Sequence, residues 1–347
     1  MNLKNKVEDI IRKHYQAQAF SGSILVRDHE QFFASGYGFA NRSEQISNTE
    51  RTRFGMASGC KIFAAVAICQ LVEQGKLTFD TYLKDCVGVS FQQFHDDITI
   101  HQLLTHTSGA PDYFDEEIMD DFEELWVATP MYSIQCPGDF LPMFKDQPMK
   151  FNPGEKFSYS NAGFILLGLI VEQVTGTPFT QYVEENIFRV SGMDDSGYYR
   201  LDQLPARTAL GYIDDEENQS WKTNIYSVPI KGGPDGGAFT TVRDLEKFWN
   251  ALTQHQLMGE KVTKQMLTPH VHSNDQVYYG YGVWMLKRED KVFKYLVFGS
   301  DPGVRLRSTY YTKSKAQAHI LANVDVGLLP IAKSIDEMVD SEQVRNG

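Results

Sequence analysis

Segments with strand character lie near both ends of this 347-residue chain, and the long stretch between them lacks the regular alternation of a strand. The strand-like segments are residues 23–26, 31–39, 281–286, 294–298, 304–311 and 318–324. Helical spacing marks residues 5–18 and 331–339. We therefore predict an α+β protein whose antiparallel sheet is built from both chain ends and flanked by helices.

The intervening section contains helical pieces separated by proline and glycine turns, and the glycine-rich residues 232–237 mark the return to the sheet. We predict a discontinuous sheet lobe over residues 1–76 plus 231–347 and a mainly helical lobe over residues 77–230. The two lobes would form one two-lobed unit. A crevice at their junction is a favoured place for a small-molecule site.

The charge balance limits the possible partners. The chain has 33 Lys and Arg against 45 Asp and Glu, and its net charge of −12 opposes binding to nucleic acid. The longest apolar run, residues 162–171, falls short of the roughly 18 residues of a membrane helix, so no membrane insertion is expected. Charges fill residues 1–20, where a signal peptide has an apolar core. We expect a cytoplasmic protein, or an envelope or secreted one if a leader has been removed.

Neither a disulfide set nor a metal set is indicated. The four cysteines lie in or beside apolar segments without CxxC spacing, which favours buried thiols. His270 and His272 could contact one metal from a strand, but no nearby carboxylate or cysteine completes a ligand set. Motifs for nucleotide cofactors are missing as well. The sequence thus predicts side-chain chemistry without a metal or cofactor.

A mostly apolar helix is expected over residues 58–77, ending near Gly75. Lys61 follows Ser58 by one helical turn, so its amine can reach the serine hydroxyl. Burial disfavours the charged form of a lysine, and an uncharged amine could take the serine proton. The alternative is a Ser58 that caps the helix and an ordinary lysine in its first turn.

A second candidate element ends the turn over residues 153–161, before an apolar helix over 162–174. A phenol at Tyr159 could move a proton between nucleophile and leaving group if a nearby ammonium lowers its pKa. The amide of Asn161 could hold a substrate carbonyl. In the alternative, Ser160 or Asn161 caps the helix and Tyr159 only packs.

These residues carry a resemblance. An S-x-x-K element at Ser58 and a Y-x-N element at Tyr159 occur in this order, together with LLTHTSG at 103–109, Pro-Gly at 153–154 and the glycines of 232–237. The chain resembles the serine β-lactamase and penicillin-binding-protein-like family over roughly residues 20–325. Within that family it is most similar to the branch of class C β-lactamases, DD-peptidases and esterases. The resemblance implies the β-lactamase/transpeptidase-like fold, with the active site between sheet and helical lobe.

The resemblance also implies roles. Ser58 would be the nucleophile, Lys61 the general base, Tyr159 the proton-transferring group and Asn161 a substrate contact. The expected reaction is acyl transfer through an acyl-enzyme, on a small ester, amide or peptide-like substrate. β-Lactamase, D-alanyl-D-alanine carboxypeptidase and esterase activities all remain open. His106 would belong to a structural turn.

The third family element departs from its pattern. Members carry K-T-G or H-x-G on the strand that lines the cleft, and this chain has Val297, Phe298 and Gly299 there. The missing cation counts against β-lactam hydrolysis and D-alanyl-D-alanine peptidase activity, because it helps to bind a substrate carboxylate. Gly299 still permits close backbone approach, and the amides of Ser300 and Ser58 match the family's oxyanion hole.

Two further features leave alternatives open. Arg305 and Arg307 share one face of a predicted strand, so Arg305 could replace the missing carboxylate anchor, although paired surface arginines are the commoner arrangement. The acidic residues 112–124 have helical spacing of their apolar positions. They are interpreted as the solvated face of a helix, with a cleft rim that repels anions as the alternative.

Two functions from different classes compete. The leading hypothesis is a serine hydrolase that uses Ser58, Lys61 and Tyr159. The alternative is a non-catalytic binding or regulatory protein that keeps the scaffold, which Val297 in the third element suggests. A reactive serine would distinguish the two. Tyr113 or Trp284 could line an acyl pocket, although core packing is the simpler role for Trp284.

Overall fold

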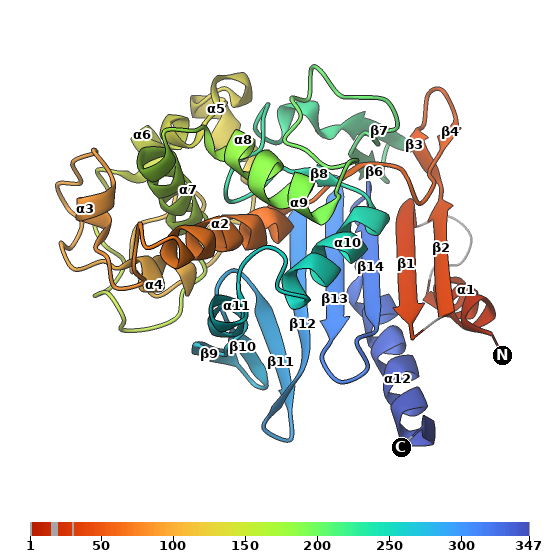
Figure 1. Ribbon diagram of the computed structural model, residues 1–347. Helices are drawn as coiled ribbons and strands as arrows, with labels where there is room; N and C mark the ends of the chain where they lie inside the picture. Colours follow the sequence, from red (N-terminus) through yellow and green to blue (C-terminus); the bar gives the residue numbers. More distant parts are fainter. Residues whose placement is uncertain (1, 15–19, 30, 347) are drawn as a thin grey trace.

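A computed structural model describes residues 2–14, 20–29 and 31–346, and its main element is an eight-stranded antiparallel sheet (Figure 1). The strand order is β2-β1-β14-β13-β12-β11-β10-β9. The strands are β1 (Gly22–Asp28), β2 (Gln31–Tyr37), β9 (Val271–Asn274), β10 (Val277–Tyr279), β11 (Trp284–Arg288), β12 (Lys291–Asp301), β13 (Val304–Tyr311) and β14 (Gln317–Ala322). The pairing of β1 with β14, with Ile24 opposite Ile320, joins the two chain ends and confirms the predicted fold class.

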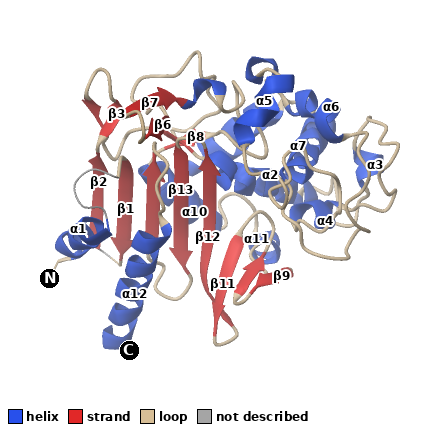
Figure 2. Cartoon of the chain, turned by 180° about the vertical axis from the view of Figure 1, so that it is seen from behind, coloured by secondary structure: helices blue, strands red, loops and turns tan. Residues whose placement is uncertain are grey.

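Two helical layers enclose the sheet. In Figure 1, α2 (Lys61–Glu73) and α10 (Val242–Thr253) lie on the near face, and Figure 2 shows α1 (Leu3–His14) and α12 (Leu329–Asn346) on the opposite face. A separate apolar cluster joins α1 and α12 to β1 and β14. Residues 15–18 of the first predicted helix lie outside the described residues.

The remaining elements are short, apart from α7 (Asn161–Thr175). The other helices are α3 (Leu83–Cys86), α4 (Ile100–Leu104), α5 (Leu125–Ala128), α6 (Leu141–Phe144), α8 (Phe179–Val183), α9 (Arg189–Ser191) and α11 (Glu260–Met266). The minor strands are β3 (Phe39–Asn41), β4 (Ile46–Ser47), β5 (Phe54–Gly55), β6 (Tyr212–Asp215), β7 (Ser220–Thr223) and β8 (Phe239–Thr240).

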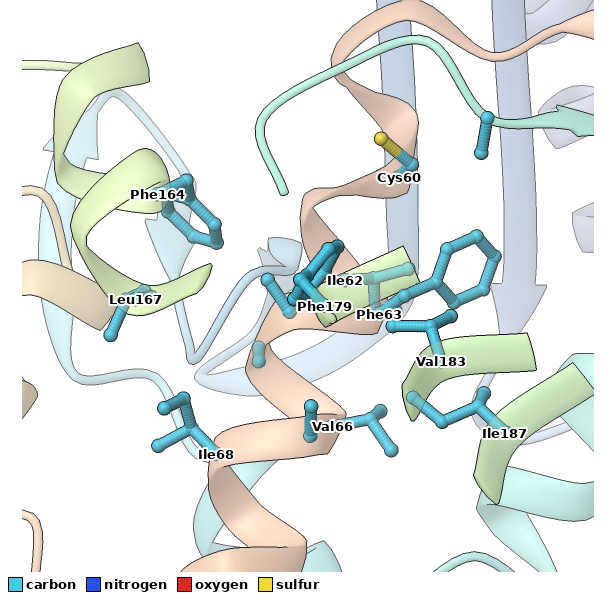
Figure 3. Close-up of a cluster of buried hydrophobic side chains, with 14 of the residues drawn as sticks. Cys60, Ile62, Phe63, Val66, Ile68, Phe164, Leu167, Phe179, Val183 and Ile187 are labelled. Atoms are coloured by element: carbon cyan, nitrogen blue, oxygen red, sulfur yellow. The ribbon is translucent and has the colours of Figure 1, made fainter. Parts of the chain in front are cut away.

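Helix α2 is the centre of the main core. Its residues from Lys61 to Leu71 are all buried, as the apolar sequence predicts. Phe63 packs edge-to-face against Phe188 and Phe248, with ring centroids 4.9 and 5.0 Å apart. Figure 3 shows side chains of α7, α8 and the turn after α8 converging on α2. Packing of this kind holds the start of α2, where the predicted nucleophile lies, in a fixed place.

Helix α7 is the second buried helix and ends at Gly176, whose φ of +67° suits a left-handed cap. Among the described residues no single helix has the length and apolarity to cross a membrane. The segment that follows α7 continues its apolar character only after a bend of 80°.

Three local predictions are corrected. Residues 77–230 were predicted to lack strands, but β6 and β7 form a hairpin there. Both strands are short and β7 is largely exposed, so their sequences do not alternate between apolar and polar residues. The strand predicted from residue 281 begins at Trp284, since Gly282 has a φ of +68° and passes close to α2. Cys60, Cys69 and Cys86 are buried free thiols as predicted, whereas Cys136 is exposed. The division into lobes at residues 76 and 231 stays a prediction.

Candidate active site

Ser58 lies in a 3-10 turn, Ala57–Cys60, that leads directly into α2. Ala57 before it has a φ of +45°, a conformation that costs a non-glycine residue on the order of 1–3 kcal/mol and that concentrates at functional sites. The Ser58 side chain caps no backbone N–H, so the capping alternative is wrong. Ser58 is half-buried and lines a cavity of about 640 Å³.

Lys61 is buried, and its amine contacts three oxygens. Nζ lies 2.8 Å from Ser58 Oγ, 2.8 Å from Asn161 Oδ1 and 2.7 Å from the carbonyl oxygen of Asp235. All three are uncharged acceptors, and no carboxylate forms an ion pair with Lys61 among the residues described. An uncharged amine also fits these contacts, since two N–H groups can donate to Asn161 and Asp235 while the lone pair accepts the Ser58 proton.

The aromatic ring of Tyr159 lies beside this pair. Burial raises the pKa of Tyr159 well above 10, and the negative charge of Glu116 adds to the effect. The condition stated for proton transfer, that a nearby ammonium lowers this pKa, is therefore not met. Nζ of Lys61 lies over the ring, 4.9 Å from its centroid, and Tyr159 is a protonated phenol at neutral pH.

His106 holds Tyr159 in place. The two backbone N–H groups that flank the tyrosine, from Ser158 and Ser160, donate to the carbonyl oxygen and Nδ1 of His106, at 2.9 and 3.0 Å. The rings of His106 and Tyr159 lie 4.4 Å apart, centroid to centroid. Burial lowers the pKa of His106 well below its usual range. The structural turn implied by the resemblance thus orients the predicted proton-transfer group.

Asn161 is the first residue of α7, and Ser160 caps the helix by accepting from the N–H of Gly163. The Asn161 side chain accepts from Lys61 through Oδ1 and donates to the carbonyl oxygen of Phe114 through Nδ2, at 3.2 Å. It lines the cavity next to Ser58. A contact with a substrate amide stays a prediction.

Asp112 was not singled out from the sequence, although it fixes the start of α7. Its carboxylate accepts from the backbone N–H groups of Asn161 and Ala162, at 2.6 and 3.1 Å. Burial raises its pKa to about 6, and these hydrogen bonds oppose the rise. Asp235 was missed too, and its carboxylate accepts from the hydroxyl of Tyr113. Both contacts join segments that are distant in sequence, so no local sequence pattern predicts them.

Strand β12 carries the third element. Gly299 meets the serine turn so closely that a Cβ there would lie 2.2 Å from the carbonyl oxygen of Met56. The close approach predicted for this glycine is thereby confirmed in its geometry. Ser300 is exposed and lines the cavity, and the oxyanion hole formed with Ser58 stays a prediction. Val297 is buried in the main core and puts no polar group into the cavity.

Arg305 and Arg307 have separate surroundings. Arg305 donates to the carbonyl oxygens of Asp301 and Val304, at 2.6 and 2.8 Å, and pairs with Asp325 at 2.9 Å. Arg307 belongs to a buried group with Asp336, and burial lowers its pKa. Only Arg305 reaches the cavity, and its guanidinium is already engaged. This arrangement gives no support to a free carboxylate anchor.

The acidic residues 112–124 do not form the predicted helix; only Phe122–Glu124 makes a 3-10 turn. The carboxylate of Asp112 accepts a hydrogen bond at the start of α7, and that of Asp115 pairs with Lys150 at 2.7 Å. These tertiary contacts outweigh the helical preference that the apolar spacing indicates. Phe114 and Glu116 line the cavity, as the cleft-rim alternative requires. Tyr113 lines it as well, and Trp284 does not.

Nε2 of His270 donates to the carbonyl oxygen of Gln265, and Nε2 of His272 donates to that of Asp275, so the two rings have different partners. Within residues 2–14, 20–29 and 31–346, no group of three or more His, Cys, Asp or Glu side chains is arranged to hold a metal. The side chains that surround Ser58 are those of Lys61, Tyr159 and Asn161, as described above.

This fold and this arrangement of side chains define a protein of the β-lactamase/transpeptidase-like class. The family model named Beta-lactamase matches residues 7–317, so the chain belongs to the β-lactamase family. A crystal structure of a penicillin-binding protein from Bacillus halodurans is 51% identical, with a TM-score of 0.91, and the match covers 96% of this chain and 99% of that one.

More distant relatives share the scaffold. A penicillin-binding protein of Bacillus subtilis is 27% identical over 82% of this chain, and the match spans 63% of that relative's length. The D-amino acid amidase from Ochrobactrum anthropi SV3, crystallised with L-phenylalanine amide, is 21% identical with a TM-score of 0.78. That match covers 97% of this chain and 99% of the amidase, and it shows a common fold.

Proposed function

We propose that this protein is a serine hydrolase that acts on small amides or esters through an acyl-enzyme. The observation that carries the proposal is the contact of Lys61 Nζ with Ser58 Oγ at 2.8 Å, in a buried place where the other partners of the amine are uncharged oxygens. At this distance the lone pair of an uncharged amine can accept the serine proton. Lys61 is therefore placed to act as a base.

In the proposed reaction, Ser58 Oγ attacks the substrate carbonyl carbon and its proton passes to Lys61 Nζ. The carbonyl π electrons move to the oxygen, which the amides of Ser58 and Ser300 stabilise. Tyr159 gives its proton to the leaving group as the C–N or C–O bond breaks, and Lys61 restores that proton. Water then attacks the acyl-enzyme ester while one of its protons passes to Lys61 Nζ. That proton returns to Ser58 Oγ as the ester C–O bond breaks, which releases the acid and regenerates Ser58.

The raised pKa of Tyr159 supports its role as a donor, because a phenol that stays protonated cannot serve as the resting base. Lys61 is left as the base. The buried Val297 supplies no cation for a substrate carboxylate, so we favour esterase or amidase activity over β-lactam hydrolysis. The same residue is the observation that favours the second candidate, a binding protein that has kept the scaffold.

The test is the intact mass of the protein after exposure to a fluorophosphonate probe at neutral pH. We expect one adduct on the wild type and none on Ser58→Ala, which should fold normally because its hydroxyl caps no helix. Ser220→Ala, at an exposed serine of β7, is the matched control and should keep the adduct. An unlabelled wild type would refute the hydrolase and favour the binding protein.

A further inference from the structure

We propose that the active site selects substrates whose leaving group contains an aromatic ring, as in a benzyl ester or a benzyl amide. This inference rests on the proposed hydrolase function and names the substrate class of the same site. Three side chains would recognise the ring, those of Tyr159, Trp284 and Phe298, which together are called the aromatic row.

Tyr159 fixes where the leaving group lies. In the proposed reaction this phenol gives its proton to the leaving atom, so that atom must come within hydrogen-bond reach of it. Ser58 and Asn161 line the cavity of about 640 Å³, whereas none of the three rings belongs to the lining that the structure describes. The acyl part of a substrate therefore has the cavity to fill, and the leaving group extends along the aromatic row.

The three rings of the aromatic row are stacked nearly parallel. The ring of Trp284 lies 6.1 Å from that of Tyr159 and 5.3 Å from that of Phe298, measured between centroids. The planes of these two pairs are inclined by 17° and 24°. Such distances and angles fit offset stacking and leave no room for another ring between two members. A further ring must therefore pack against the exposed part of the row, which belongs to Phe298.

The pairing of β11 with β12 explains why Phe298 is exposed. Trp284, the first residue of β11, pairs with Leu296 of β12, and Phe298 lies two residues beyond that pair. The side chains of Trp284 and Phe298 therefore share one face of the sheet, whereas Val297 points to the other and is buried in the main core. Because Phe298 lies past the start of β11, its ring is covered on one side only and is 42% exposed.

The exposed ring of Phe298 would gain from a ring in the leaving group. Removal of apolar surface from water is favourable in proportion to its area, so any apolar leaving group that covers Phe298 is bound more tightly than a small one. An aromatic leaving group adds the preference of rings for offset stacking. Neither Val297 nor Phe298 offers a polar side chain to a charged leaving group. The aromatic row therefore favours an aromatic leaving group over an aliphatic one of the same size.

Three phosphonothioates with one common phosphonyl group test the inference; their leaving thiols are phenylmethanethiol, cyclohexylmethanethiol and methanethiol. In each case Ser58 Oγ forms a P–O bond, the P–S bond breaks, the serine proton passes to Lys61 and Tyr159 protonates the thiolate. The mass of the adduct is thus the same, and division by the rate of hydrolysis in buffer removes intrinsic reactivity. We expect the phenylmethyl probe to label about three- to tenfold faster than the cyclohexylmethyl probe, and the methyl probe to be slowest.

Phe298→Leu keeps an apolar side chain and removes the ring, so the phenylmethyl and cyclohexylmethyl probes should then label at about equal corrected rates. Phe39→Leu, on β3, is the matched control, since Phe39 is 41% exposed, and it should keep the wild-type preference. Equal rates for the two ring probes in the wild type, a preference that Phe298→Leu does not change, or labelling by the fluorophosphonate alone would overturn the inference while the hydrolase stands. If the fluorophosphonate does not label Ser58 either, the proposed function itself fails.

Discussion

Two buried lysines lie on opposite faces of the sheet, and their surroundings differ in one respect. Lys61, at the start of α2, contacts three uncharged oxygens. Lys294, on β12, contacts the carboxylate of Asp336 in α12, which also accepts from the Tyr311 hydroxyl at 2.6 Å. Burial lowers the pKa of Lys294, and Asp336 opposes this effect. The comparison teaches that the partners of a buried lysine decide its role: Lys294 is held by a carboxylate, whereas Lys61 lies within hydrogen-bond distance of a serine hydroxyl.

The largest effect is expected from Lys61→Met, which keeps the length of the side chain and removes the base. Labelling of Ser58 by the fluorophosphonate probe should slow about 10²- to 10⁴-fold, the usual contribution of a general base. The free energy of unfolding should change little or rise, because a buried amine without a counter-ion is replaced by an apolar chain. Labelling at the wild-type rate would show that Lys61 is not the base.

Lys294→Met is expected to lower the stability of the protein and to leave the labelling of Ser58 unchanged. Loss of this ammonium leaves Asp336 without its cation, which should lower the free energy of unfolding by about 3–5 kcal/mol in denaturant titrations. Labelling of Ser58 in the folded protein should keep its rate, since Lys294 lies on the far face of the sheet. A second substitution, Asp336→Asn, should recover part of the stability. Unchanged stability in Lys294→Met would remove the structural half of the comparison.

A smaller, pH-dependent effect is expected from Asp112, a buried carboxylate that backbone N–H groups hold instead of a lysine. Its pKa in the folded protein is about 6, above the ordinary 3.8, so its contribution to stability is present below 3.8 and is lost as the pH rises through 6. Between these pH values the wild type should lose about 1–3 kcal/mol relative to Asp112→Asn.

Denaturant titrations of both proteins across this pH range measure the difference. Asp290→Asn serves as the control, since its carboxylate is exposed. A constant difference between the wild type and Asp112→Asn would mean that the hydrogen bonds from Asn161 and Ala162 fully offset the burial of Asp112.

Local patterns predicted much of the candidate site. The spacing of Ser58 and Lys61 implies one helical turn, and the contact of 2.8 Å follows from it. The strands that join the chain ends could be predicted because they are apolar runs rich in residues that favour strands. The hairpin of β6 and β7 was missed because its strands have only four residues each.

The surroundings of these side chains could not be predicted in the same way. Asp112, Asp235 and His106 reach the site from distant segments, through contacts that follow no sequence period. The condition that a nearby ammonium lowers the pKa of Tyr159 is not met, because burial raises this pKa. The acidic residues 112–124 have helical spacing, but the contacts of Asp112 and Asp115 decide their path.

The sequence by itself determined which groups can react and in which local order they stand, because one helical turn and one short turn are fixed by backbone geometry. Only the tertiary structure decided which lysine is paired with a carboxylate and which arginine is already engaged. Those properties depend on distances between residues far apart in the chain and on exclusion of water, and both arise only when the lobes pack together.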